Sequence, residues 1–238
     1  VILLGPPTHN GGDPGVARMQ ATDDADCPYQ VRFAEWDYRA RDYNDLWHKP
    51  EQISYLGLSP GVYTMDDGSV WEVGGFDSWG NGVWKTVPFQ SGFAGIPALF
   101  LTIQTANGTE TTTARARNVA PSGFDAAMFE EEYLMSGGHA TETIGYVAIY
   151  HPDGVTSPSV EGVATINGAE IPYALHRTWV NHNWTAVDGI ELHLEEEQSV
   201  DDEVAHKDEM VDALTIGNQV FAQQVSSYGG DTTAIRRR

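Results

Sequence analysis

The same short set of polar residues occurs three times along this chain of 238 residues. Each set combines an acidic residue just after a glycine, an arginine five positions later, and a His-x-x-Glu pair. A fixed polar set on an otherwise diverged background indicates a repeated structural unit, so we expect copies of one unit rather than one catalytic centre. The sets are, in turn, Asp13, Arg18, His48 and Glu51; Glu110, Arg115, His139 and Glu142; and Asp231, Arg236, His206 and Glu209.

The third set is out of order, because its His-x-x-Glu pair precedes its acidic residue and arginine. In the second copy 46 residues separate Trp84 from the acidic run at Glu130, whereas only 11 separate Trp184 from Glu195 in the third. A segment that matches the missing middle stands at residues 220–236. Either the third unit is circularly permuted and folds its own tail back, or the tail completes a unit on a neighbouring chain.

Short apolar runs, bounded by Gly, Pro, Asn and Asp, predict strands nearly throughout. The stretches 195–214 and 121–134 have helical composition, but they carry acidic clusters in place of an apolar stripe. Many short strands with frequent turn signals favour an all-β fold of tandem antiparallel β-sandwiches. The expected strands are 1–4, 29–33, 53–58, 83–89, 98–103, 113–119, 123–129, 144–150, 161–166 and 189–194.

The repeat also divides the chain. Residues 1–60 are expected to form the first β-sandwich repeat, and residues 82–151 the second. A Gly- and Trp-rich hairpin insert would lie between them at 61–81, and a spacer at 152–172 would lead to the permuted third repeat at 173–238.

Composition excludes several classes of protein. The chain has 34 acidic against 13 basic residues and a net charge of −21, which suggests a halophilic or marine source or bound divalent cations. It has no basic stripe for nucleic acid and no apolar run long enough to insert into a membrane. One cysteine, Cys27, excludes an internal disulfide framework.

The second copy resembles a known family. Its pattern runs through Val87-Pro-Phe89, residues 96–101, residues 114–119, Ser122-Gly-Phe124 and residues 144–149. It is similar to the H-type lectin domain, the six-stranded antiparallel sandwich of snail agglutinins. It also resembles tandem repeats in large extracellular proteins of marine bacteria.

This resemblance implies a non-enzymatic sugar-binding module that trimerises, with glycan sites at subunit boundaries, located outside the cell or on its surface. In that family an acidic residue on an early loop, an arginine on a central strand and a histidine on a late loop hold the sugar hydroxyls. The resemblance assigns the first role to Asp13, Glu110 and Asp231, the second to Arg18, Arg115 and Arg236, and the third to His48, His139 and His206.

A second interpretation gives the same residues no ligand. A carboxylate, a guanidinium and an imidazole can hold sugar hydroxyls, but they can equally form a buried charged network that fixes the geometry of loops. Repetition in all three copies fits such a scaffold at least as well, because a scaffold element must recur whereas a ligand site need not.

The acidic runs offer hard oxygen ligands of the kind that Ca²⁺ takes. No spacing matches a helix-loop-helix calcium site, and a solvated acidic surface is the alternative. Calcium is therefore a candidate cofactor and none is required. The residues concerned are Glu130, Glu131, Glu132, Glu195, Glu196, Glu197, Asp201, Asp202 and Glu203.

Enzymatic activity is not expected, because the chain has no nucleophile elbow, phosphate loop or dinucleotide fingerprint. The sequence favours glycan recognition and self-association. The alternative is a structural subunit of an extracellular filament or virion appendage. Such a subunit would use the displaced half-repeat for strand exchange between chains.

Overall fold

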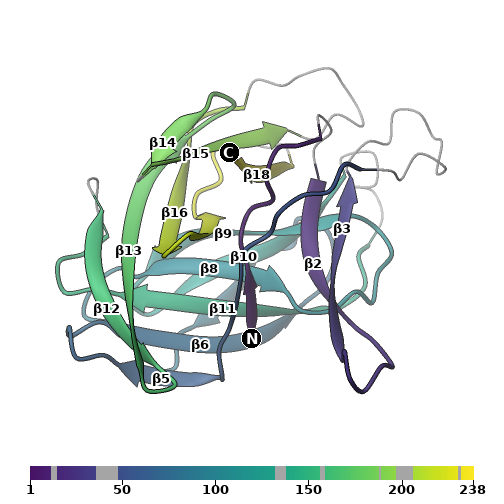
Figure 1. The fold of residues 1–238 in the computed structure, drawn as a ribbon. Coiled ribbons are helices and arrows are strands. Elements are labelled where there is room, and N and C mark those ends of the chain that lie inside the picture. Colours follow the sequence, from purple (N-terminus) through teal and green to yellow (C-terminus); the bar gives the residue numbers. More distant parts are fainter. Residues whose placement is uncertain are drawn as a thin grey trace.

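The computed structural model describes residues 1–11, 15–35, 48–131, 138–155, 159–187, 189–196, 206–229 and 232–238. All named strand pairs in these ranges are antiparallel, and none of the described residues forms a helix (Figure 1). The prediction of an all-β protein is confirmed. The strands group into three units, which we call the first, second and third in chain order.

The second unit contains a four-stranded and a three-stranded sheet. The four-stranded sheet has the order β5-β6-β11-β8, and the three-stranded sheet has the order β7-β10-β9. The strands are β5 (Gly61–Thr64), β6 (Val70–Ser78), β7 (Lys85–Pro88), β8 (Ala98–Ile103), β9 (Thr112–Ala120), β10 (Gly123–Glu130) and β11 (Glu142–Tyr150).

The third unit repeats this arrangement with a different chain order. Its sheets have the orders β12-β13-β16-β17 and β14-β15-β18. The tail supplies β17 and β18, which pair with β16 and β15 of the same chain. The strands are β12 (Val160–Ile166), β13 (Ala169–Val180), β14 (Thr185–Val187), β15 (Ile190–Glu196), β16 (Glu209–Ile216), β17 (Gln219–Gln224) and β18 (Thr233–Arg237).

The first unit is the smallest of the three. It pairs β1 with β4 and β2 with β3, as β8 pairs with β11 and β9 with β10 in the second unit. The described residues offer no counterpart of β5, β6 and β7 in this unit. Its strands are β1 (Ile2–Leu4), β2 (Gly15–Ala21), β3 (Tyr29–Glu35) and β4 (Tyr55–Gly57).

The long apolar strands of the second unit are buried on both faces. Along β11, Ile144 and Tyr146 point into the core between the two sheets of this unit, whereas Val147 and Ile149 face the other way. Successive side chains of a strand alternate between faces, so a continuous apolar run fits a strand with protein on both sides.

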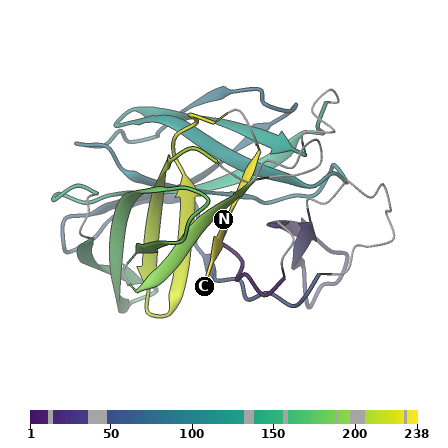
Figure 2. The same ribbon diagram turned by 90° about the horizontal axis from the view of Figure 1, so that it is seen from above.

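The outward faces of the units join them into one body. Trp71 and Phe100 of the second unit share a core with Tyr173 and Phe221 of the third and with Leu3 of the first. A smaller core lies between the two sheets of the third unit. The N-terminal segment also meets the C-terminal strand, because Thr8 forms a parallel bridge with Arg237, and Figure 2 shows this strand passing close to the N-terminal segment.

The sheets correct two expected boundaries. The range 61–81 is not a separate insert, because β6 pairs along its whole length with β11. The range 152–172 is likewise more than a spacer, since β12 and the start of β13 lie in it and pair with each other. Both segments carry many turn residues, and 61–81 also carries the exposed Tyr63 and Trp79, so the single face that each strand buries is concealed in the sequence.

The tail strand β17 should be essential to stability, because Phe221 is 1% exposed in the core that joins the units. We expect Phe221→Ala to lower the free energy of unfolding by about 3–5 kcal/mol, the usual cost of emptying a buried phenylalanine site. Denaturant unfolding in concentrated salt measures this loss. Val163→Ala on β12 is the control, because Val163 is 39% exposed and should change stability by less than about 1 kcal/mol. Equal effects of the two variants would contradict the role of β17.

Candidate functional site

The glutamate of each His-x-x-Glu pair is buried and receives the backbone of a glycine loop. Glu142 accepts hydrogen bonds from the backbone amides of Asn107 and Gly108, at 3.0 and 2.8 Å, and from the Thr105 hydroxyl. The other two glutamates repeat this set. Glu51 accepts from Asn10, Gly11 and Thr8, and Glu209 accepts from Tyr228, Gly229 and Ser226.

The histidine of each pair lies directly on the glycine of the same loop. A Cβ atom on Gly108 would come within 2.6 Å of His139 Cε1. At Gly11 and Gly229 the corresponding approaches to His48 and His206 are 2.4 and 2.2 Å. Real Cβ atoms do not come so close, so each loop requires glycine for the approach of the ring.

Each arginine of the repeated set pairs with the glutamate of another unit. The arginine lies on β2, β9 or β18, and its guanidinium reaches the His-x-x-Glu pair of the next unit. The three nitrogen–oxygen distances are 3.4 Å for Arg18 and Glu142, 3.5 Å for Arg115 and Glu209, and 3.0 Å for Arg236 and Glu51.

These pairs close a cycle from the first unit to the second, the second to the third, and the third back to the first. None of the six side chains is more than 4% exposed. Backbone carbonyls accept further hydrogen bonds from two of the arginines. Arg18 donates to Gly108 O at 2.7 Å, and Arg236 donates to Thr8 O at 2.6 Å. We call this set of pairs the arginine–glutamate ring.

In the second unit, His139 lies beside the ring and contacts two glutamates. Its Nδ1 contacts Glu130 and its Nε2 lies 3.2 Å from Glu142. Burial by itself lowers the pKa of His139, but hydrogen bonds to Glu142 and Glu130 outweigh it and raise the pKa above the usual value. Burial opposes ionisation of Glu142 as well, and its bonds to His139, Thr105 and the loop amides nevertheless lower its pKa to about 2.

The third unit has the same contacts with longer distances. His206 lies 3.5 Å from Glu196 and 3.4 Å from Glu209, and the pKa of Glu209 is about 2 despite its burial. In the first unit His48 Nδ1 instead meets the Lys49 carbonyl at 2.7 Å and lies 3.5 Å from Glu51.

These positions favour the scaffold interpretation of the repeated residues. The three arginines, the three histidines and the three glutamates occupy the interior and present no surface for a sugar. Among the described residues of the repeated set, Glu110 reaches solvent. Its side chain is 41% exposed and lies 3.9 Å from His139. Asp13 and Asp231 lie outside the described residues.

The described acidic residues do not gather into the expected calcium clusters. Glu195 and Glu196 point to opposite faces of β15, where Glu195 meets Arg236 and Glu196 meets His206. Glu130 is engaged by His139, and Glu131 is buried. Adjacent residues of a strand cannot converge on one ion, so runs of carboxylates are a poor sign of a site. Glu132, Glu197, Asp201, Asp202 and Glu203 lie outside the described residues.

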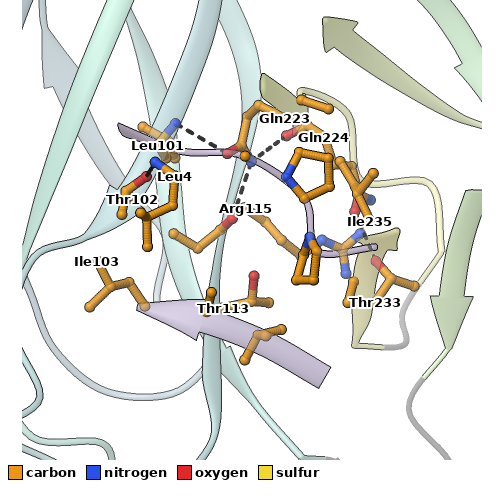
Figure 3. Close-up of a pocket in the computed structure, with 18 of the residues that line it drawn as sticks. Leu4, Leu101, Thr102, Ile103, Thr113, Arg115, Gln223, Gln224, Thr233 and Ile235 are labelled. Carbon is orange, nitrogen blue, oxygen red and sulfur yellow. Dashed lines mark hydrogen bonds between the residues drawn. The ribbon is translucent and has the colours of Figure 1, made fainter. Parts of the chain in front are cut away.

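A small cavity lies where the three units meet. It has a volume of about 90 Å³ and is lined by corresponding strands of all three units, β1, β8 and β17 with β2, β9 and β18. Figure 3 shows polar bonds that cross it, from Leu4 N to Thr102 Oγ1 and from Leu101 N to Gln223 Oε1. Ligand pockets usually measure about 300–1,000 Å³, so this cavity is too small for a sugar.

An open groove at the boundary of the second and third units is larger. Its volume is about 470 Å³, and its lining includes Arg117 and Asn118 from β9 and Tyr228 from the loop before β18. Trp179 of β13 stands beside Tyr228, with ring centroids 5.7 Å apart and planes 32° apart. The two rings are 47% and 63% exposed, so they offer an aromatic surface next to hydrogen-bonding side chains.

The sequence patterns indicated neither this groove nor the hydroxyl partners of the buried glutamates. Thr8, Thr105 and Ser226 occur at the same position in each copy, three residues before the loop glycine, and this spacing was the available signal. The aromatic pair gave no signal, because Trp179 and Tyr228 are 49 residues apart and meet through the fold.

Comparison with known proteins gives one relative. The chain is 26% identical over 151 residues to halomucin of Haloquadratum walsbyi, an alignment that covers 63% of this chain and 2% of halomucin. The chain thus corresponds to a small fraction of that protein. No protein-family model and no solved structure matches it. No helix among the described residues is long and apolar enough to cross a membrane.

Loss of one arginine from the ring should destabilise the protein strongly. Arg115→Met leaves Glu209 buried without its guanidinium partner, and we expect a loss of about 3–5 kcal/mol in the free energy of unfolding. Arg117→Met is the matched control on the same strand, because Arg117 is 39% exposed where it pairs with Asp125. Denaturant unfolding distinguishes the two, and a loss below about 1 kcal/mol for Arg115→Met would show that the ring is not needed.

Stability should depend on pH in two windows. The lowered pKa of Glu142 stabilises the fold fully above about 4.5, and this contribution is lost as the pH falls from there toward about 2. The raised pKa of His139 acts in the opposite sense: it stabilises the fold fully below 6.5 and is lost as the pH rises through the folded value.

Unfolding midpoints between pH 3 and pH 8 check this dependence. Glu142→Gln should be less stable than the parent at pH 6 and should lose less stability on acidification. Glu161→Gln, at an exposed position of β12, should follow the parent curve. Parallel curves for the parent and Glu142→Gln would contradict the assignment.

Proposed function

We propose that this chain is a non-enzymatic glycan-binding protein of a halophile surface. In this proposal its three units are copies of an H-type-lectin-like sandwich, with the third copy circularly permuted. The observation that carries the proposal is the exposed Trp179–Tyr228 pair: Tyr228 lines a groove between two units together with Arg117 and Asn118, and Trp179 lies beside Tyr228.

The arrangement of the units supports the relation to a trimeric lectin. The second and third units have the same neighbour order in both sheets, and the first unit has the corresponding central pairs. The arginine–glutamate ring then joins the units cyclically. The family resemblance implies three subunits with sites at their boundaries, and here one chain would supply all three.

The chemistry of the groove suits a carbohydrate. An aromatic ring covers the apolar face of a sugar, while guanidinium, amide and hydroxyl groups exchange hydrogen bonds with its hydroxyls. Arg117 and Asn118 lie on β9, and Ser226 and Ser227 also line the groove. The groove is also large enough for one or two sugar rings by the usual size of ligand pockets.

The net charge of the chain and its similarity to halomucin support a salt-rich environment outside the cell. A net charge of −21 is tolerated when salt screens the repulsion, and halomucin belongs to Haloquadratum walsbyi. By its name halomucin is a mucin of a salt-loving organism, which favours an extracellular or cell-surface location for this chain too. As the chain corresponds to 2% of halomucin, the activity of the whole relative is not transferred.

The filament alternative has less support. It relies on a displaced half-repeat that pairs with another chain, yet β17 and β18 pair with β16 and β15 of their own third unit. A tail already paired in this way is not available as a donor strand.

Removal of the aromatic pair should abolish glycan retention and leave the fold intact. We expect Trp179→Ala and Tyr228→Ala to weaken binding by about 2 kcal/mol each, or roughly 30-fold, as for exposed aromatic anchors in other interfaces. A glycan array in concentrated salt, with thermal melts of the same proteins, measures both properties. Trp79→Ala is the control, because Trp79 is 54% exposed in the second unit and is not among the residues that line the groove.

Two outcomes would contradict the proposal: the parent protein retains no glycan, or Trp79→Ala loses as much binding as Trp179→Ala. Glu110→Ala belongs in the same set, since it tests the site that the family resemblance implies. If Glu110→Ala alone loses binding, the groove is not the glycan site.

A further inference from the structure

Two histidines and a glutamate converge on one point between the first and third units. His9 precedes the first glycine loop, and His193 and Glu195 lie on β15. His9 Nε2 lies 2.7 Å and His193 Nε2 3.1 Å from the same oxygen, Glu195 Oε1. The three ligand atoms all lie within 4.8 Å of one another.

Hydrogen bonding fixes which nitrogen of His193 faces the glutamate. Its Nδ1 lies 3.3 Å from the His182 carbonyl, and a carbonyl can only accept, so Nδ1 carries the proton. In a neutral ring Nε2 then presents a lone pair toward Glu195 Oε1. Two lone pairs at 3.1 Å require a cation between them, either a second proton or a metal ion.

Neighbouring groups hold the three ligands in place. The Trp184 ring stacks on His193 at 4.1 Å between centroids and meets His9 edge-on at 5.6 Å. The second oxygen of Glu195 is 3.2 Å from Arg236, which leaves Oε1 for the histidines. Outer partners of this kind orient metal ligands and fix the tautomer of the histidine.

The cluster does not belong to the repeated scaffold. Strand register places His193 opposite Arg236, as Ala127 lies opposite Arg115 and Arg32 opposite Arg18. The same registers align Glu195 with Phe129 and Ala34, and the loops align His9 with Ala106 and Ser227. The other two unit boundaries thus close without these three side chains.

We propose that His9, His193 and Glu195 form a binding site for one divalent transition ion of the zinc type. Two imidazole nitrogens and one carboxylate oxygen are ligands that Zn²⁺ takes, and three protein ligands leave a position for water or an outside ligand. The site is open to solvent on the side of His9, whose side chain is 32% exposed. The site lies between the first and third units, so a bound ion also links the first unit, which has the smallest sheets, to the third.

Zinc titration by isothermal calorimetry tests the site directly. The tag-free chain, stripped with a chelator and held in concentrated KCl, should bind one Zn²⁺ ion. His9→Ala and His193→Ala should each weaken that binding at least 10-fold, and both should fold, because the second unit has alanine at both corresponding positions, as Ala106 and Ala127. His182→Ala, which keeps the carbonyl that orients His193, is the control and should bind as the parent does. Calcium chloride should give no comparable heat, since imidazole is not a calcium ligand.

Four outcomes would overturn the site. If the parent takes up no Zn²⁺, a proton alone holds the histidines and the glutamate together. If both variants bind as tightly as the parent, the ion lies elsewhere. Loss of binding in Glu110→Gln, with binding retained in His193→Ala, would place it at Glu110, Glu130 and His139, which also lie close together. An equal loss in His182→Ala would remove the assigned ligand set.

Discussion

The arginine–glutamate ring is the interaction on which the rest of the structure depends. Burying a guanidinium and a carboxylate is costly, and the cost is recovered only when both groups are fully paired and hydrogen-bonded. Each glutamate here has an arginine from another unit and the amides of its own glycine loop. A unit taken alone would keep a buried glutamate without an arginine. The three units therefore need one another, which gives a physical reason for the survival of the polar set in all three, including the one with a different chain order.

The residues of the ring differ from the residues that form the candidate sites. The repeated arginines, histidines and His-x-x-Glu glutamates are buried and hold the units together, whereas the candidate sites use residues that occur at one boundary each. The Trp179–Tyr228 groove lies between the second and third units, and His9 with His193 and Glu195 lies between the third and the first. These two boundaries therefore combine the common ring with side chains that the other boundaries lack. Repetition in the sequence therefore indicates the residues that join the units, and it does not indicate the residues of the candidate sites.

Acidic residues serve in two different ways. Some carboxylates are interior and lowered in pKa by hydrogen bonds, as Glu72 is by the amides of Gln90 and Ser91 and by the Tyr146 hydroxyl, although burial opposes ionisation. Asp212 is the exception, because complete burial raises its pKa although Arg177 lies beside it. Other described carboxylates, such as those of Glu161 and Glu170, lie on the surface, where salt screens them. The net charge of the sequence therefore indicates an environment, while the individual interior carboxylates determine the fold.

The sequence by itself determined the all-β class, ten of the strands, the three copies of the polar set and the presence of a displaced half-unit at the C-terminus. These follow from local patterns: the spacing of apolar residues, the glycine loops and the distances between tryptophans and acidic runs. Only the tertiary structure decided which partners meet. Arg18 belongs to the first set in the sequence but pairs with Glu142 of the second, and residues 61–81 prove to be strands of a neighbouring sheet. The aromatic groove and the histidine cluster were equally hidden, because each is assembled from side chains far apart in the chain. Local patterns report what a segment can form, whereas burial and charge pairing between distant segments are decided when the units close on one another.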